Sequence, residues 1–269
     1  NLVVHLHRNP KKLVEYLEKV KSSKDDRYEV ALVKMIKGGE KMQAVEYNGF
    51  WQPIKYPWQI HNVFLHFIKS RKKSISKSAK IAKRVVINGN VIIGNNVKIY
   101  DGAVINGPCY IGDNCVIATN TLVRESNIGA NCVIGFGSEI ARSHLGDNVW
   151  THCNYIGDSV IGNNVSFGSG TVIGNLRLDE DNVKVDYDGK KINTESIKFG
   201  AIIGDDVRVG INVSLMPGIK IGNNSFIGAG IVVAENIPDN TFVRGTWKLK
   251  MSENKFEGLK SRDSFKDKL

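Results

Sequence analysis

An aliphatic side chain recurs at every sixth residue over long stretches of the sequence. The first run holds nine positions in unbroken register: Ile75, Ile81, Ile87, Ile93, Ile99, Ile105, Ile111, Ile117 and Val123. A second strict run follows: Ile203, Val209, Leu215, Ile221, Ile227 and Val233. Between them, mostly five- and six-residue steps connect Ile128, Ile134, Ile140, Leu145, Ile156, Ile161 and Phe167. This period fits neither an amphipathic helix, which repeats every ~3.6 residues, nor a simple strand, which repeats every second residue.

Short strands joined by tight turns satisfy a period of six. Three such units make a triangular coil of about 18 residues, and successive coils pair as parallel sheets around an apolar core. Gly and Asn, which tolerate positive φ, cluster at the expected corners: Gly94-Asn95-Asn96, Gly112-Asp113-Asn114, Gly162-Asn163-Asn164 and Gly222-Asn223-Asn224. The sequence therefore predicts a mainly β fold, with a parallel β-helix from residue 75 to about 238.

The four cysteines do not form a metal-binding or redox motif. They contain no Cys-x-x-Cys pair and no zinc spacing, and we expect all four to be reduced and buried: Cys109, Cys115, Cys132 and Cys153. Cys109 and Cys115 occupy the small inward position four residues after an aliphatic one. Packing is therefore favoured over catalysis for both.

The segments that flank the repeat have a different pattern. Three helices are predicted before it, over 11–21 after Asn9-Pro10, over 28–37 and over 58–72. Because an open coil exposes unpaired strand edges, we expect this α-rich region, residues 1–72, to cover an end of the β-helix. The β-helix domain is predicted over 73–246, and a basic tail over 247–269.

Composition describes an ordinary soluble globular protein, with 42% hydrophobic and 24% charged residues. No run of about 18 apolar residues is present and the start lacks the features of a signal peptide, so we expect a cytoplasmic protein without membrane contact. Because the first residue is Asn1 and not Met, a fragment or a processed product is one interpretation of the chain.

The chain is basic, with a formal net charge of +10. The excess lies mainly between Lys69 and Lys83 and in the tail from Lys248, and no nucleic-acid motif accompanies either cluster. We expect no nucleic-acid partner. A solvated basic face and a site for phosphorylated small molecules both remain open.

The hexapeptides over residues 75–238 resemble those of the left-handed β-helix acyltransferases. The resemblance implies a left-handed coil, a homotrimer and active sites at the subunit boundaries. The segments 151–158 and 166–175 are more specifically similar to the acetyltransferase half of bifunctional sugar-1-phosphate nucleotidylyltransferase/acetyltransferases, particularly archaeal ones. This implies acetyl-CoA as co-substrate, His152 as the general base, and Tyr155 and Asn175 as sugar contacts.

The same resemblance implies a phosphate-binding arginine at Arg124. The family also has a lysine that holds the phosphate; here Ala141 and Arg142 stand near that place, and Arg142 is the candidate substitute. The coil is interrupted by an excursion over 176–200, from which Lys184 can reach a sugar phosphate or CoA. A solvated loop of mixed charge explains the excursion equally well.

The chemistry of acyl transfer supports His152 independently, since an amine that attacks a thioester needs a base with a pKa near neutral. Oxyanion donors are expected from the backbone of the Gly168-Ser169-Gly170 turn. The last coils resemble the segment that holds the pantetheine arm, with Ala229 and Gly230 allowing close approach. Arg244 is a candidate contact for the nucleotide phosphates of CoA, although a solvated basic tail also accounts for it.

Residues 47–58 resemble the end of the nucleotidylyltransferase domain of the same bifunctional family. That family has a Trp-x-Asp-Ile-Gly pattern with a metal-binding Asp, but after Trp51 this chain has Pro53 in place of the Asp and Lys55 in place of the Gly. The glycine-rich nucleotide loop is absent from the sequence. We therefore interpret 1–72 as a truncated remnant and expect no nucleotidyl transfer.

The leading hypothesis is acetyl-CoA-dependent N-acetylation of glucosamine 1-phosphate, or alternatively of its galactosamine epimer, without a metal, in the biosynthesis of UDP-N-acetylglucosamine (UDP-GlcNAc). A non-catalytic β-helix that serves as scaffold or regulatory subunit is the main alternative. A third class, the β-helical carbonic anhydrases, needs three histidines around zinc. Only His144 and His152 lie on the coil, which argues against that class.

Overall fold

The structure is a computed structural model that describes residues 4–24, 26–246, 248 and 250–255. It contains two compact units, residues 1–53 and 54–269. In the first, α1 (Pro10–Glu18) packs on α2 (Arg27–Lys37), and the side chain of Asn9 accepts a hydrogen bond from the Lys12 N–H at the start of α1. Both helices were predicted from the sequence.

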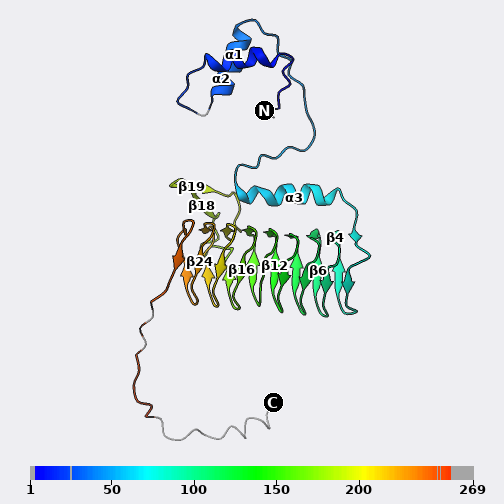
Figure 1. Ribbon diagram of the computed structural model, residues 1–269, viewed down its shortest axis with the longest axis vertical. Coiled ribbons are helices and arrows are strands. Elements are labelled where there is room, and N and C mark those ends of the chain that lie inside the picture. The colour runs from blue at the N-terminus through cyan, green and yellow to red at the C-terminus, as the bar shows by residue number, and fades with distance from the viewer. Residues whose placement is uncertain (1–3, 25, 247, 249, 256–269) are drawn as a thin grey trace. The chain divides into compact units, whose positions relative to one another are not determined.

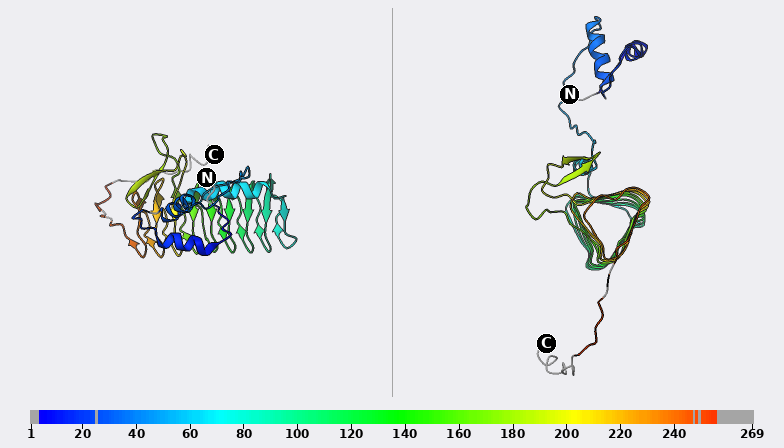
Figure 2. Two further views of the ribbon diagram at one scale, coloured as in Figure 1. Left: turned by 90° about the horizontal axis from the view of Figure 1, so that it is seen from above. Right: turned by 90° about the vertical axis from the view of Figure 1, so that its left-hand side faces the viewer.

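The second unit is a parallel β-helix of triangular cross-section (Figure 2), as the hexapeptides predict, and it is left-handed, as the family resemblance implies. Its three walls are named here sheets A, B and C. Sheet A has the order β1 (Ser74–Ile75), β4 (Val91–Ile93), β7 (Cys109–Ile111), β10 (Asn127–Ile128), β13 (His144–Leu145), β15 (Val160–Ile161), β20 (Ile202–Ile203) and β23 (Lys220–Ile221).

Sheet B consists of two four-stranded parts joined through an isolated bridge at Trp150. The first part contains β2 (Lys80–Ile81), β5 (Lys98–Ile99), β8 (Val116–Ile117) and β11 (Val133–Ile134). The second contains β16 (Ser166–Phe167), β21 (Arg208–Val209), β24 (Phe226–Ile227) and β26 (Phe242–Val243).

Sheet C completes each coil. Its strands are β3 (Val86–Asn88), β6 (Val104–Asn106), β9 (Leu122–Arg124), β12 (Glu139–Ala141), β14 (Tyr155–Gly157), β17 (Val172–Ile173), β22 (Ser214–Leu215) and β25 (Val232–Val233). The corners that connect the walls are called B–C, C–A and A–B.

The predicted inward positions form one continuous core. From Ile93 to Val233, the aliphatic residues of the repeat are buried and stack in a single cluster, and Asn residues adopt the positive φ expected at corners, as at Asn96 and Asn224. Cys109, Cys115 and Cys132 are buried in it, as predicted. Cys153 is exposed, contrary to expectation, because it belongs to a B–C corner and not to a strand that faces the core.

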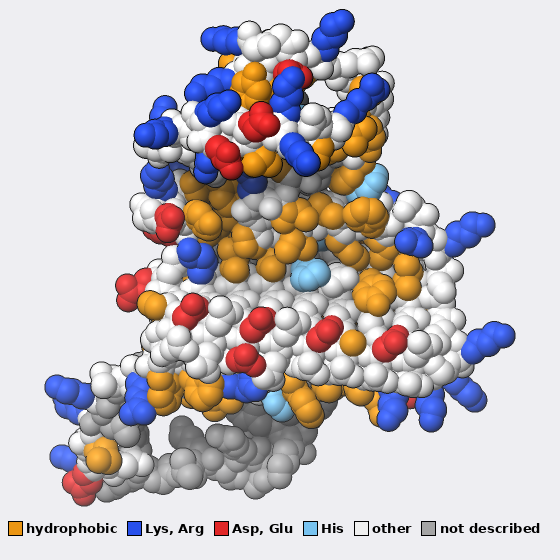
Figure 3. All heavy atoms as spheres, turned by 45° about the horizontal axis from the view of Figure 1, so that its top comes forward, with side chains coloured by type: hydrophobic (Ala, Val, Ile, Leu, Met, Phe, Trp, Pro, Cys, Tyr) orange, Lys and Arg blue, Asp and Glu red, His pale blue; other side chains and the backbone are white. Residues whose placement is uncertain are grey.

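A helix runs along the coils (Figure 1), following the short η1 (Pro57–Gln59). This helix, α3 (Ile60–Lys69), matches the third predicted helix. Its end is held by Asn90, whose amide donates to the carbonyls of Ile68 and Arg71 at 2.7 Å each. Hydrophobic side chains gather where α3 lies above the coils (Figure 3). Although it falls within the predicted N-terminal domain, α3 is part of the β-helix unit.

The helix lies along the side of the β-helix and leaves the first coil open. Ile75 and Ile81, which the repeat places inward, are 38% and 36% exposed. The excursion leaves the coil after β17 and forms an antiparallel hairpin of β18 (Lys184–Tyr187) and β19 (Lys190–Asn193). Trp58 packs at the foot of this hairpin, against Phe199.

Candidate functional site

His152 lies in a B–C corner that is shorter than its neighbours. On sheet B, Val133 lies six residues before Glu139, the next outward position on sheet C, whereas Trp150 lies only five residues before the corresponding Tyr155. The His152 side chain is exposed, while its backbone is fixed. Its carbonyl accepts a hydrogen bond of 2.7 Å from the Ser138 hydroxyl.

The side chain of Asn154 makes three hydrogen bonds to backbone groups at this shorter corner. The buried amide oxygen accepts from the His152 N–H at 2.7 Å, and the amide nitrogen donates to the carbonyls of Gly168 and Thr171 at 2.8 and 3.1 Å. All of these groups lie at the corner, so Asn154 determines the path of the chain through His152. Sequence reasoning missed this residue, although an Asn at an inward position is a usable signal.

Several predicted acyl-donor residues follow His152 along the same corner. The Gly170 N–H donates to the Cys153 carbonyl at 2.9 Å, which places Ser169 on the next coil opposite Cys153, the residue that follows His152. The N–H of Gly168 is also engaged, with the Val209 carbonyl at 2.7 Å. Within the described part of the chain, the Ser169 N–H has no acceptor, so it is the donor of this turn that remains for an oxyanion.

The corner continues to the last coil. The Gly230 N–H donates to the Ile211 carbonyl at 2.8 Å, and Ala229 beside it is exposed. Arg244 follows on the last coil, with its guanidinium over the Phe242 ring, 4.4 Å from the ring centroid. The structure therefore brings His152, Ser169, Ala229 and Arg244 along one edge of the β-helix.

Three other predicted residues meet at the C–A side of sheet C. Arg142 forms a two-pronged ion pair with Asp158, with distances of 2.6 and 2.7 Å, and this pairing raises the pKa of the guanidinium. The Asn175 amide donates to the same carboxylate and lies 3.0 Å from the Tyr155 hydroxyl. The phenol can reach this far because Gly157, in the same strand, has no side chain in its way.

Arg124 is engaged elsewhere. Its Nε and Nη2 both donate to one carboxylate oxygen of Glu139, at 2.9 and 2.6 Å, on the neighbouring strand of sheet C. It shares sheet C with Tyr155, but a phosphate at Arg124 has to compete with Glu139.

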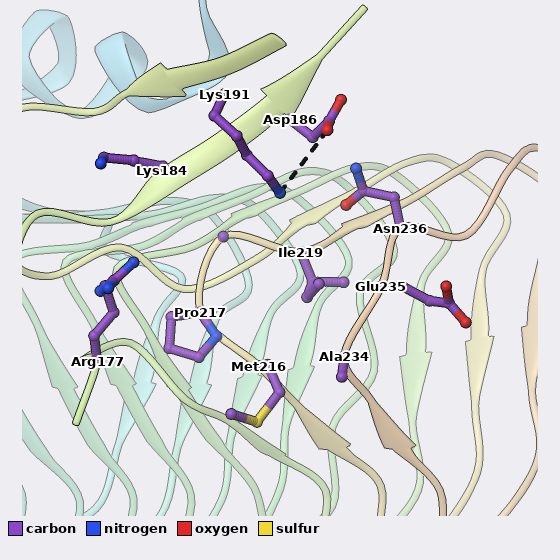
Figure 4. Close-up of a pocket in the computed structure, with 11 residues that line it drawn as sticks. Arg177, Lys184, Asp186, Lys191, Met216, Pro217, Ile219, Ala234, Glu235 and Asn236 are labelled. Atoms are coloured by element: carbon purple, nitrogen blue, oxygen red, sulfur yellow. Dashed lines mark ion pairs between the residues drawn. The ribbon is translucent and has the colours of Figure 1, made fainter. Parts of the chain in front are cut away.

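Lys184 lies apart from His152 and lines a hollow of about 650 Å³ beneath the β18–β19 hairpin. Figure 4 shows it with Arg177 on one side and the Lys191–Asp186 ion pair, 3.8 Å, on the other. Met216 and neighbouring residues of the C–A corner form the floor. The predicted role of Lys184 in binding substrate stays a prediction.

Two partly buried histidines, His61 and His144, lie at α3 and on the sheet beside it. Burial lowers the pKa of His61 in α3, while Asp158 and Glu125 act in the opposite direction. Burial also lowers the pKa of His144 in β13, whose Nδ1 is buried without a hydrogen-bond partner among the described residues. Neither histidine was predicted as a site residue.

A second hollow of about 370 Å³ is lined by His152 together with Trp150, Ser166 and Arg208 of sheet B. Sequence reasoning also missed Arg208. In the part of the chain that the structure describes, no three His, Cys, Asp or Glu residues are arranged to hold a metal ion. No described helix is long and apolar enough to cross a membrane.

Comparisons with known proteins agree with the repeat. Residues 70–177 match the GMPPB C-terminal domain family, and residues 200–234 match the bacterial transferase hexapeptide family. The Bifunctional protein GlmU of Methanococcus maripaludis strain C5 is 44% identical over 221 residues, which cover 79% of this chain and 51% of the relative. The Bifunctional sugar-1-phosphate nucleotidylyltransferase/acetyltransferase of Sulfurisphaera tokodaii is 36% identical over 236 residues, covering 85% and 58%.

The chain therefore spans about half the length of the curated relatives it matches. Among solved structures, a UDP-N-acetylglucosamine acyltransferase has a TM-score of 0.39 and 16% identity, covering 62% of this chain and 69% of that one.

Proposed function

The chain is a hexapeptide-repeat left-handed β-helix protein that resembles the C-terminal half of archaeal bifunctional sugar-1-phosphate nucleotidylyltransferase/acetyltransferases, and we propose that it transfers an acetyl group from acetyl-CoA to the amine of an amino-sugar 1-phosphate. Glucosamine 1-phosphate is the first candidate and galactosamine 1-phosphate the second. The names of the relatives support the reaction class. The observation that carries the proposal is the exposed His152 with a fixed backbone, together with the free N–H of Ser169 at the same corner of the next coil.

The proposed chemistry uses these two groups directly. The amine nitrogen attacks the thioester carbonyl carbon, the Ser169 N–H donates to the oxyanion that forms, and the His152 imidazole accepts the amine proton. The carbon–sulfur bond then breaks, and the CoA thiolate leaves and takes up a proton. An acetamide and free CoA thiol are the products, and the reaction needs no redox partner.

The sugar is proposed to lie over sheet C, where Tyr155 and Asn175 already bond to each other and to the Asp158–Arg142 pair. This network supplies hydrogen-bonding groups on β14, which begins three residues after His152. The acyl donor is proposed to follow the B–C corner from Ser169 and Gly170 past Ala229 and Gly230 to Arg244.

We also propose a homotrimer, as the resemblance implies. Phe136, Phe226 and Phe242 are exposed on the B–C side, and another copy of the chain would bury them. A light-scattering mass of three times the chain mass of 29.8 kDa is expected. A monomeric mass at the concentrations used for assays would contradict the trimer.

The segment before the β-helix is proposed to have no nucleotidyl-transfer activity. Pro53 stands where the resemblance requires a metal-binding Asp, and proline offers no side-chain ligand. Release of pyrophosphate from UTP in the presence of a sugar 1-phosphate would contradict this.

The direct test measures thiol release from acetyl-CoA in the presence of glucosamine 1-phosphate or galactosamine 1-phosphate. The substitution His152→Ala is expected to lower kcat by about 10²–10⁴-fold, the usual contribution of a general base. A matched control, His7→Gln, removes an imidazole from the other unit and is expected to leave kcat unchanged. Full activity of His152→Ala would reject His152 as the general base. An inactive native protein would favour the non-catalytic scaffold role.

A further inference from the structure

The hollow beside His152 exists because of the order of outward side chains on sheet B. Trp150 and Arg208 flank Ser166, which pairs with both of them in parallel register. Neighbouring strands lie ~4.8 Å apart, so two large side chains stand about 10 Å apart over a small one. His152 follows Trp150 by two residues and lines the same hollow.

Arg208 is fixed in place without being neutralised. Its Nη1 donates to the carbonyls of Asn164 and Val207, and its Nη2 donates to the Asn164 side-chain oxygen at 2.9 Å. All of these acceptors are uncharged, and no described carboxylate forms an ion pair with Arg208. A guanidinium has five N–H donors, so some of them remain available to a ligand.

The two arginines predicted to hold phosphate differ from Arg208 in this respect. Arg124 pairs with Glu139 and Arg142 pairs with Asp158, and both pairs are close and two-pronged. A phosphate that approaches them meets a carboxylate. Arg208 presents a positive charge without that competition.

Trp150 contributes the other half of the hollow. Trp150 is 53% exposed and lines the hollow together with the arginine. An aromatic face packs against a flat or ring-shaped group, while a guanidinium binds phosphate oxygens. The pair therefore fits a phosphate carried on a ring.

We propose that the hollow formed by Trp150, Ser166 and Arg208 binds the phosphoryl group of a substrate that reacts at His152, with the ring that carries the phosphate packed on Trp150. This inference rests on the proposed acetyl transfer. Two substrates share the required chemistry: the sugar 1-phosphate and the phosphorylated adenosine of CoA. In the first case the sugar ring lies at the B–C corner, with its hydroxyls towards sheet C, and in the second case the nucleotide of CoA lies on sheet B and not at Arg244.

Steady-state kinetics of the full chain distinguishes these two sources. Arg208→Gln is expected to raise the KM for one substrate at least tenfold and to change kcat less than threefold. A rise for glucosamine 1-phosphate identifies the sugar phosphate, and a rise for acetyl-CoA identifies the donor. Arg84→Gln, which removes an exposed arginine from an early coil, is the matched control and is expected to leave both KM values unchanged.

A second variant tests the hollow without changing charge. Ser166→Val fills the space between Trp150 and Arg208 with a side chain suited to a strand, and it is expected to raise the same KM as Arg208→Gln. Circular dichroism and the thermal midpoint verify that both variants fold.

Calorimetric binding of glucosamine 1-phosphate and of CoA separates the proposed phosphate site from the proposed acetyl transfer. An active native protein whose KM values do not change in Arg208→Gln would overturn the phosphate site alone. If the native protein is inactive, a tenfold weaker binding of either ligand by Arg208→Gln still supports the site. Equal affinities, or no binding of either ligand to the native protein, would overturn it.

Discussion

The coils near the two ends of the β-helix differ in length from those in the middle. Ser74 pairs with Ile92, 18 residues further on, and Ile202 pairs with Lys220, again 18 residues on. In the middle, Tyr110 pairs with Asn127 after 17 residues, and Glu139 pairs with Tyr155 after 16. The long coils contain the strict repeat, and the short ones contain most of the candidate site.

This difference shows how a repetitive scaffold acquires a particular site. A full six-residue step gives each corner the same turn, whereas the five-residue step at His152 requires a new path for the backbone. The buried side chain of Asn154 supplies hydrogen bonds along that path. The shortened corner is therefore a place where one coil departs from its neighbours without interrupting the core.

Restoring the missing residue is expected to have the largest effect. One glycine inserted between Cys153 and Asn154 gives this corner the length of the others, so the coils can still stack, but the His152 N–H loses its contact with Asn154. We expect the rate of thiol release to fall at least ~100-fold, within the range that a general base contributes. A glycine inserted between Asp188 and Gly189, at the tip of the hairpin, should leave the rate unchanged. Normal activity of the corner variant would show that the shortened corner at His152 is not needed for the reaction.

Core truncations compare the stability of the two kinds of coil. Ile105→Ala in an 18-residue coil and Ile156→Ala in a short one both remove a fully buried side chain. Each is expected to lower the free energy of unfolding by about 2–5 kcal/mol, as measured by denaturant titration. Under conditions in which both variants are folded, only Ile156→Ala, next to Tyr155, should also lower activity. Equal activity losses would show that the site is not confined to the short coils.

Asn154→Ala isolates the side chain that stabilises the short corner. It leaves the His152 N–H and two carbonyls without their partner, and we expect a loss of about 1–3 kcal/mol in the free energy of unfolding. Asn48→Ala, at an exposed position in the other unit, is the control and should be neutral. An unchanged thermal midpoint for Asn154→Ala would mean that the corner keeps its path without the amide.

The smallest effect concerns pH and the face covered by α3. Burial holds the folded-state pKa of His61 and His144 below the unfolded value of 6.5. The unfolded chain therefore binds these protons first, so stability is full above pH 6.5 and declines as pH falls through that value towards the folded pKa. The thermal midpoint should decrease between pH 7.5 and 5.5, and by less in His61→Gln. An equal decrease in that variant would rule out His61 as a cause.

Much of the fold follows from the sequence because side-chain burial repeats with the coil. Ile105 and Ile156 are buried where the period places them, and α3 follows its apolar spacing. The role of Arg208 does not follow in this way. Arg208 lies beside Ser166, which is 42 positions earlier in the sequence. The two residues pair only because the coil resumes in register after the excursion. Likewise, the exposure of Cys153 depends on the short corner, which a regular period does not describe.

The position of α3 has a consequence for how the protein unfolds. In a solenoid each coil contacts only its neighbours, so coils can be lost one after another from an end. The segment around α3 connects coils that do not touch, because Asn90 holds its end and Phe199 packs on Trp58 at its start. Opening any coil between them has to break contacts with the same helix. We therefore expect these coils to exchange their amide hydrogens as one cooperative unit, and the open first coil to exchange earlier.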